Sequence, residues 1–138
     1  MTTMIKGRSF LMDTMAILWF AFLPKRLPRA AREAILDEET HLAFSTVSLW
    51  EIGLKMSVGG YRDFKLPDDW ERCIPEGLKQ QGITPLGIDA VHCRRIQDLP
   101  FHHRDPFDRM LAAQCLIEGM SMISSDTIFE TYGIKRVW

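Results

Sequence analysis

The chain has 138 residues, of which 46% are hydrophobic and 25% are charged, and its formal net charge is −1. This length and balance predict one globular domain over residues 1–138 with a sizeable apolar core, and they exclude an intrinsically disordered chain. The nearly neutral charge also excludes binding to polyanions by bulk attraction alone, so a nucleic-acid contact would need local basic patches.

Three cysteines lie far apart in the sequence, at Cys73, Cys93 and Cys115, and none belongs to a Cys-x-x-Cys pair. They indicate neither a disulfide framework nor a zinc knuckle, and they fit a reducing cytoplasm. The apolar run "FLMDTMAILWFAFL" is interrupted by Asp13 and no small-residue cleavage site follows it. It is also shorter than the roughly 20 apolar residues that span a bilayer. We therefore expect a cytoplasmic protein with no membrane partner.

Short apolar runs and helical periodicity alternate along the chain. Apolar runs bounded by turn residues predict strands, and apolar residues three and four positions apart predict helices. The first half of the chain predicts, in order, a strand at Ser9–Met12, a helix at 15–23, a helix at Pro28–Glu39, a strand at His41–Thr46 and a helix at 48–60 that stops at two glycines.

The second half continues the alternation. It predicts a helix pair at 66–82 broken at Pro67 and Pro75, a short strand at 83–88, a short helix at 89–99, a long helix at 105–119, a strand at 120–126, a helical turn at 127–133 and a strand at 134–138. Strands that alternate with helices form parallel sheets covered on both faces. The predicted fold is therefore an α/β class, three-layer α/β/α sandwich with a central, mostly parallel sheet.

Acidic residues stand where the predicted strands end. Asp13 closes the first strand, and Asp126 closes the strand at 120–126. Because ligands of open parallel sheets collect beyond the carboxyl ends of the strands, both carboxylates are expected at one edge. Glu51 and Asp108 each lie in the first turn of a predicted helix, so all four carboxylates converge if those helices enter from the same edge.

Such a cluster predicts a cation. Carboxylates held close together raise one another's pKa unless a positive charge lies among them, and no lysine is adjacent to any of the four. Mg²⁺ and Mn²⁺ prefer carboxylates, water and substrate phosphates as ligands. One or two such ions can activate water and stabilise the charge that develops when a phosphodiester is cleaved.

Each acid also has a purely structural interpretation, which the spacing alone leaves open. Asp13 fits an Asx turn with Thr14. Glu51 fits a capping box in which Ser48 is the N-cap, and it also fits an ion pair with Lys55 one turn later.

The later acids have structural alternatives as well. In "DPFD", Asp105 fits the N-cap, Pro106 the first helical position and Asp108 the third. Asp126 fits the start of the next helical turn. Asp105 is a second-tier candidate for the metal site, because two carboxylates three residues apart share a helix face.

Four stretches resemble, in order and spacing, the PIN-domain ribonucleases and specifically the VapC-like toxins of bacterial type II toxin–antitoxin pairs. They are "FLMDTMAILWF", "STVSLWEIGLKMSVG", "LPFHHRDPFDRMLAAQCLIEGMSMISSD" and "FETYGIKRVW". The likeness runs from about Ser9 to Trp138, and "HHRDPFDRMLAAQ" together with "SLWEIGLK" is a specific signature. It implies a small α/β fold, an acidic pocket that holds Mg²⁺ or Mn²⁺, and cleavage of single-stranded RNA. It also implies a cognate antitoxin partner and a homodimer.

The resemblance implies that four acids bind the metal and carry the catalysis: Asp13, Glu51, Asp108 and Asp126. Ser124 occupies the usual Thr/Ser position, where it would bind a ligand water or the substrate, and Thr14 would orient Asp13. Met15 departs from the family pattern, since many relatives have a polar residue there. That departure leaves the RNA target open and does not touch the chemistry.

Basic residues flank the proposed site. Arg104 and Arg109 would contact RNA phosphate, because Arg suits bidentate phosphate binding, or they would form salt links with neighbouring aspartates. His102 and His103 point to opposite sides of an extended segment and have no other His or Cys at ligand spacing. A structural role is therefore favoured for both histidines over a zinc site.

The resulting hypothesis is metal-assisted hydrolysis of an RNA phosphodiester, with in-line attack and no covalent enzyme intermediate. Two alternatives remain open. A haloacid-dehalogenase-like phosphohydrolase would use Asp13 as nucleophile, but Met15 stands where that class needs a second Asp. A non-catalytic PIN-fold protein-binding module is the other, and the presence of all four acids disfavours it.

Overall fold

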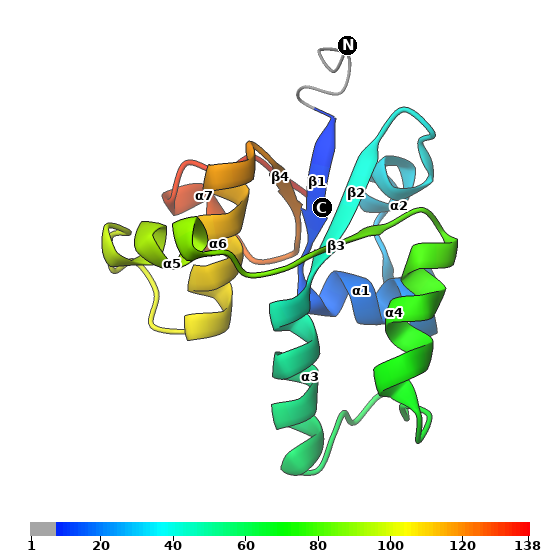
Figure 1. The fold of residues 1–138 in the computed structure, drawn as a ribbon. Coiled ribbons are helices and arrows are strands. Elements are labelled where there is room, and N and C mark those ends of the chain that lie inside the picture. Colours follow the sequence, from blue (N-terminus) through cyan, green and yellow to red (C-terminus); the bar gives the residue numbers. More distant parts are fainter. Residues whose placement is uncertain (1–7) are drawn as a thin grey trace.

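A computed structural model describes residues 8–138, which form five strands packed between helices (Figure 1). The strands pair in the order β3-β2-β1-β4-β5, and every pairing is parallel. Their bounds are β1 Ser9–Met12, β2 His41–Ser45, β3 Thr84–Leu86, β4 Ser121–Ile123 and β5 Arg136–Val137. The predicted mostly parallel sheet is confirmed, with the last three strands shorter than the runs that predicted them.

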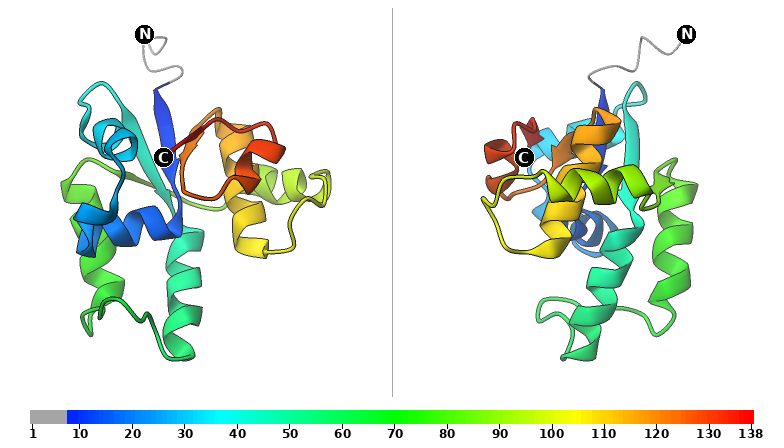
Figure 2. Two further views of the ribbon diagram at one scale, coloured as in Figure 1. Left: turned by 180° about the vertical axis from the view of Figure 1, so that it is seen from behind. Right: turned by 60° about the vertical axis from the view of Figure 1, so that its left-hand side comes forward.

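Helices connect the strands and cover both faces of the sheet. They are α1 Thr14–Phe22, α2 Arg29–Leu36, α3 Thr46–Ser57, α4 Trp70–Gln80, α5 Ala90–Gln97, α6 Pro106–Glu118 and α7 Ile128–Thr131, with a 3₁₀ turn, η2, at Pro24–Arg26. Figure 2 shows α1, α2 and α4 on one side of the sheet and α5, α6 and α7 on the other. The predicted α/β/α sandwich is confirmed.

Two hydrophobic clusters occupy the two sides of the sheet, because successive strand residues face opposite ways. Phe10 and Met12 of β1 pack with α1, α2 and α4. Leu11, between them, packs with α6 and the segment around α7. Both faces of β1 are therefore buried, which explains why its sequence is apolar throughout instead of alternating.

The register brings the carboxyl ends of three strands level. Met12 lies opposite Phe44 of β2 and Ile123 of β4. The Asp13 N–H continues this ladder by donating to the Ile123 carbonyl at 3.1 Å. The chain leaves β1 in the centre, reaches β2 on one side and β4 on the other, and so forms the topological switch point at which α/β sheets bind ligands.

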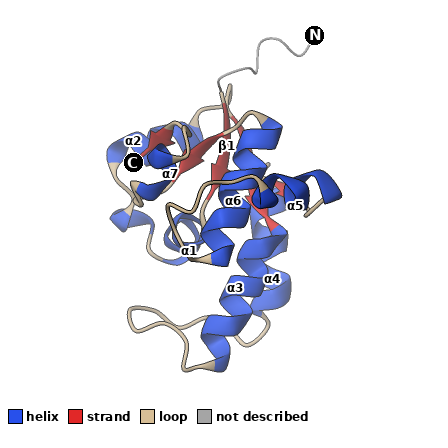
Figure 3. Ribbon diagram, turned by 90° about the vertical axis from the view of Figure 1, so that its left-hand side faces the viewer, coloured by secondary structure: helices blue, strands red, loops and turns tan. Residues whose placement is uncertain are grey.

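Helix α3 starts earlier than predicted. Its N-cap is Ser45, whose Oγ accepts the Val47 N–H at 3.1 Å, so β2 runs directly into the helix. Ser48 therefore lies inside the helix, where it is buried, and the predicted capping box of Ser48 and Glu51 is wrong. Figure 3 shows α3 and α4 extending side by side beyond the sheet.

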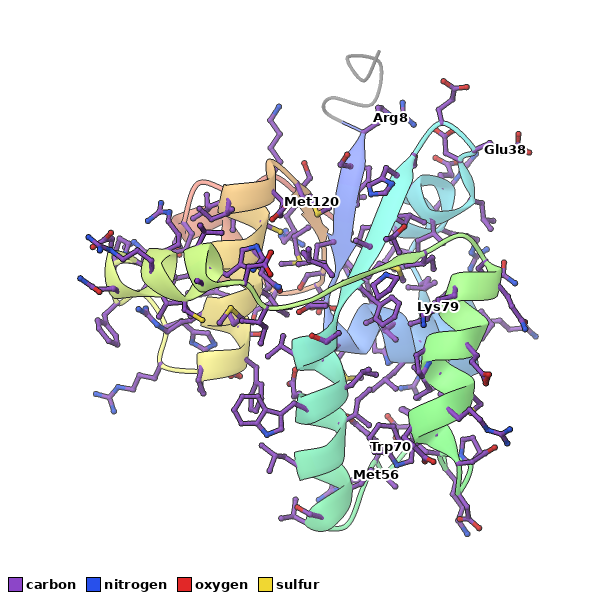
Figure 4. All side chains as sticks on the ribbon, in the orientation of Figure 1. Arg8, Glu38, Met56, Trp70, Lys79 and Met120 are labelled. Atoms are coloured by element: carbon purple, nitrogen blue, oxygen red, sulfur yellow. The ribbon has the colours of Figure 1, made fainter. Side chains whose placement is uncertain are left out.

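The segment predicted as a helix pair is one helix, α4, with Pro75 inside it. Proline in a helix interior removes a backbone hydrogen bond and is costly. Ile74 and Leu78 are both buried in the core on either side of it, and that burial holds the helix together across the proline. Trp70, labelled with Met56 in Figure 4, packs against the same core from the first turn.

Helix α2 ends at Leu36, three residues before the predicted end. The Asp37 side chain accepts the Glu39 N–H at 2.9 Å and turns the chain out of the helix. Aspartate competes with helical hydrogen bonding in this way. Within residues 8–138, no helix is long and apolar enough to cross a membrane.

Candidate functional site

Asp13 lies at the centre of the site, between the end of β1 and the start of α1. Its Oδ1 accepts the Ala16 N–H at 2.8 Å, so Asp13 is the N-cap of α1. The pKa of its carboxyl is raised from 3.8 to about 6, chiefly by burial and in smaller part by the charges of Glu51 and Asp126. Hydrogen bonds from Ser124 and the Ala16 N–H act in the opposite direction.

Glu51 enters the site from α3, held by the first helical residue of α1. Thr14 Oγ1 lies 2.5 Å from Glu51 Oε1 and 2.9 Å from the Oγ of the buried Ser48. Burial raises the pKa of Glu51, with a smaller rise from the charge of Asp105, while the Thr14 hydrogen bond lowers it. Lys55 does not neutralise this carboxylate: its Nζ lies over the Tyr61 ring, 5.8 Å from the centroid.

Asp105 and Asp108 lie at the start of α6. Asp105 is the N-cap, as the sequence predicts, and its Oδ1 accepts the Phe107 N–H at 2.9 Å. Asp108 lies within the first turn, with its Oδ2 3.0 Å from His103 Nε2. The pKa of Asp108 is raised to about 7 by burial and by the charges of Asp105 and Glu51, while the contact with His103 lowers it.

Asp126 and Ser124 follow β4. Ser124 is fully buried, and its Oγ accepts the Asp126 N–H at 2.9 Å. Asp126 is exposed, and its Oδ1 accepts the Ile128 N–H at 3.0 Å just before α7. Ser124 thus connects the central Asp13 to the backbone that carries Asp126.

We call the five carboxylates around this sheet edge the acidic edge: Asp13, Glu51, Asp105, Asp108 and Asp126. The negative charges of these residues contribute to the raised pKa values of Asp13, Glu51 and Asp108. Among the ion pairs of residues 8–138, none joins any of the five to a Lys or Arg, and His103 is the one basic partner. Carboxylates that repel one another, four of them half-buried and none with a Lys or Arg partner in the described part of the chain, fit a divalent cation.

The ligand atoms of the acidic edge do not form one closed shell. In the part of the chain that the structure describes, the one group of three whose ligand atoms lie within 4.8 Å of one another is His103, Asp105 and Asp108. Such an open arrangement suits Mg²⁺ or Mn²⁺, because Mg²⁺ retains several waters and is commonly held by one or two carboxylates with substrate phosphates.

A cleft of about 650 Å³ runs beside the acidic edge. Glu51, Asp105 and Thr14 contribute its polar wall, and Leu54, Val58 and Phe107 contribute apolar surface. The cleft is large enough for more than one residue or nucleotide of a partner, since ligand pockets of roughly 300–1,000 Å³ hold drug-sized molecules.

The two arginines predicted to flank the site are placed differently. Arg104 is exposed. Arg109 is only 5% exposed, and it donates to the carbonyls of Pro100 at 2.9 Å and Leu99 at 3.2 Å. Its guanidinium is therefore occupied by backbone acceptors inside the protein, and the predicted phosphate contact by Arg109 does not fit this placement.

Sequence reasoning missed His103 as part of the site. The extended segment before α6 turns so that this histidine reaches Asp108, while His102 packs on Tyr132 with ring centroids 5.1 Å apart. The two adjacent histidines thus contact different elements of the fold. The available signal was a histidine five residues before an acid in the first turn of a helix.

One comparison with known proteins identifies the family of this chain. The family model described as PIN domain matches residues 10–135. No curated protein matches the chain.

Solved structures share this fold. VapBC2 from Rickettsia felis, bound to a DNA fragment from their promoter, aligns with a TM-score of 0.68 and 10% identity, covering 93% of this chain and 96% of that chain. FitAcB from Neisseria gonorrhoeae gives a TM-score of 0.55 and 17% identity, covering 92% and 95%. FitAB bound to an IR36 DNA fragment gives 0.57 and 16%, covering 92% of each. With the family model spanning nearly all of the described chain, this protein belongs to the PIN domain family.

Proposed function

We propose that this chain is a Mg²⁺- or Mn²⁺-dependent endoribonuclease that hydrolyses single-stranded RNA and serves as the toxin of a toxin–antitoxin pair. PIN domains are generally nucleases and typically use divalent metals. The observation that carries the proposal is the acidic edge, where five carboxylates meet at the switch point of the sheet without a Lys or Arg ion pair among the described residues.

Four of these acids would hold the ion, directly or through water: Asp13, Glu51, Asp108 and Asp126. A bound divalent ion lowers the pKa of water and offsets the charge that develops on a phosphodiester during hydrolysis. The chain's own residues orient the ligands. Thr14 fixes Glu51, Ser124 connects Asp13 with Asp126, and His103 fixes Asp108. Asp105 adds negative charge and caps α6.

The proposed toxin role rests on the solved structures that share the fold. They are complexes named VapBC2 and FitAB, and two of them are bound to DNA. By analogy we propose an antitoxin protein as the partner of this chain, a homodimer as its assembly, and the cytoplasm as its location. The cleft beside Glu51, which has both polar and apolar walls, offers a surface of the right size for a partner segment.

Cleavage of single-stranded RNA by the purified chain tests the proposal. We expect cleavage with Mg²⁺ or Mn²⁺, none with EDTA, and none by Asp13→Asn in either condition. Glu38→Gln is the matched control, because Glu38 is an exposed acid of the loop after α2 and lies outside the acidic edge. Full metal-dependent activity in Asp13→Asn would sink the assignment. A protein that folds but shows neither cleavage nor Mn²⁺ binding by calorimetry would instead be a non-catalytic binding module.

A further inference from the structure

The loop between α5 and α6 presents an aromatic ring to solvent. Phe101 is 82% exposed, more than any other large apolar side chain of the described residues. Exposing a phenylalanine forgoes about 1.5–3 kcal/mol of burial, and because single exposed apolar residues are common, the significance of this ring depends on what it contacts.

One face of the ring contacts a buried cation. The Arg109 Cζ lies 4.1 Å from the Phe101 centroid. Arg109 is itself fixed by the carbonyls of Ile96, Leu99 and Pro100, at 3.3, 3.2 and 2.9 Å. A cation at this distance from an aromatic face is attracted to it, which leaves the opposite face to solvent.

The residues after Phe101 are held in place. His102 packs on Tyr132, and His103 Nε2 lies 3.0 Å from Asp108. The exposed ring therefore stands two residues from a side chain that touches the acidic edge. Arg104, the next residue, adds an exposed positive charge to the same loop.

We infer that Phe101 is a stacking platform for a nucleobase of single-stranded RNA that is bound at the acidic edge; this inference rests on the proposed function. Every base has a π-face, so stacking on an aromatic side chain holds RNA whatever its sequence. A ring that already packs on Arg109 before binding loses little conformational freedom when the base arrives. Arg104 supplies charge for the phosphates, which a purely apolar protein partner would not need.

The test measures RNA binding apart from cleavage. In an Asp13→Asn background with Mg²⁺, short single-stranded oligoribonucleotides carry 2-aminopurine at successive positions, and its fluorescence falls where the base stacks. We expect Phe101→Ala to weaken binding roughly 5- to 150-fold and to remove the quenching at one position. Phe101→Trp should retain both, and Phe101→Leu should lose both while keeping an apolar side chain. Leu36→Ala, at a remote apolar residue that is 65% exposed, is the matched control.

A second oligonucleotide separates stacking from a general loss of structure. When the stacked position is abasic, Phe101→Ala and its parent should bind equally. The stacking role is contradicted if Phe101→Ala loses as much affinity for the abasic oligonucleotide as for the intact one. It is also contradicted if Phe101→Ala binds the intact oligonucleotide as tightly as its parent does. If the wild-type chain cleaves RNA while Phe101→Ala binds normally, only the platform falls. If the parent binds no RNA and the wild type cuts none, the proposed function falls with it. A Phe101→Ala defect confined to binding an antitoxin protein also overturns the inference.

Discussion

The hydroxyl oxygen of Thr14 lies 2.5 Å from Oε1 of Glu51, which joins the first residue of α1 to a carboxylate of α3. Since Thr14 directly follows Asp13, one short segment after β1 sets the positions of two acids. The expected role of Thr14 was to orient Asp13, and the structure instead places its side chain on Glu51.

We expect Thr14→Val to leave the fold intact and to weaken Mn²⁺ binding about 10- to 150-fold, the range given by losing one hydrogen bond to a charged group. Valine keeps the volume but cannot hold Glu51, whose pKa rises further because the Thr14 hydrogen bond lowers it. Titration calorimetry with Mn²⁺ measures the change. Thr14→Ser keeps the hydroxyl and should bind normally, and a Ser variant as weak as the Val variant would contradict the assigned role.

The metal-free protein should lose stability as the pH rises. The pKa of Asp13 is raised from 3.8 to about 6 in the folded state, so the folded protein binds this proton more tightly than the unfolded chain does. The free energy of unfolding therefore falls between about pH 4 and pH 6, and the full penalty of about 3 kcal/mol is present above pH 7. Asp108, with a pKa raised to about 7, acts in the same direction.

Urea unfolding in EDTA, at pH 5 and at pH 8, measures this effect for the wild type and for Asp13→Asn. The variant lacks the titrating group, so we expect it to exceed the wild type in stability by about 3 kcal/mol at pH 8 and by about half as much at pH 5. Equal stability of the two proteins at pH 8 would show that Asp13 pays no burial penalty.

Divalent metal should reverse the destabilisation at pH 8. A ligand that binds only the folded state adds about 2.7 kcal/mol at a hundredfold excess over its Kd. We expect 10 mM Mg²⁺ to raise the Tm of the wild type and of Glu38→Gln equally. Asp13→Asn and Glu51→Gln should show little or no rise, whereas an equal rise in all four proteins would point to non-specific binding.

We expect Asp105 and Asp108 to have different roles, Asp105 as a helix cap and Asp108 as a metal ligand. Asparagine caps a helix about as well as aspartate, so Asp105→Ala is the informative change, and we expect it to lower stability by about 1 kcal/mol. Asp108→Asn should preserve stability and reduce cleavage by more than the roughly 10- to 100-fold typical of residues that only orient ligands. Unfolding and cleavage of both variants give the comparison, and a stability loss confined to Asp108→Asn would reverse the assignment.

Arg109 should prove important for stability. Arg109→Met keeps an apolar stem but leaves three backbone carbonyls without their donor, and we expect a loss of about 3 kcal/mol in urea unfolding. Arg94→Met is the control, because Arg94 is exposed and pairs with Asp98 at 3.7 Å, a surface contact that contributes 1 kcal/mol or less. Equal losses of stability in the two variants would contradict the role of Arg109 as a donor to these backbone carbonyls.

The sheet and its acids could be predicted because they follow from local patterns. The apolar run at Ser9–Met12 has no polar alternation, which marks a strand buried on both faces. Once the strands are parallel, Asp13 and Asp126 must lie at the same edge whatever the strand order. The cap formed by Asp105 likewise depends only on its immediate neighbours.

What the sequence could not show depends on contacts between distant elements. Arg109 follows an acid of the site along the chain, yet it turns inward because the carbonyls at the end of α5 accept its protons. Pro75 breaks a helix by local rules, and the burial of Ile74 and Leu78 overrides them. The partner of Thr14 lies 37 residues away in another helix, so no local spacing could reveal it.

The position of Asp13 between β1 and β4 has a consequence for biosynthesis. The Asp13 N–H bonds to Ile123, and its carboxylate is held by Ser124, so the central acid is complete only when a strand made late in translation has docked beside one made early. A nascent chain that has emerged only as far as α6 has Asp13, Glu51 and Asp108, but it lacks β4 and Ser124, which hold Asp13 in place. Under the proposed function, a cell translating this chain would therefore meet hydrolytic activity only after β4 had been synthesised, with no active fragment released on the way.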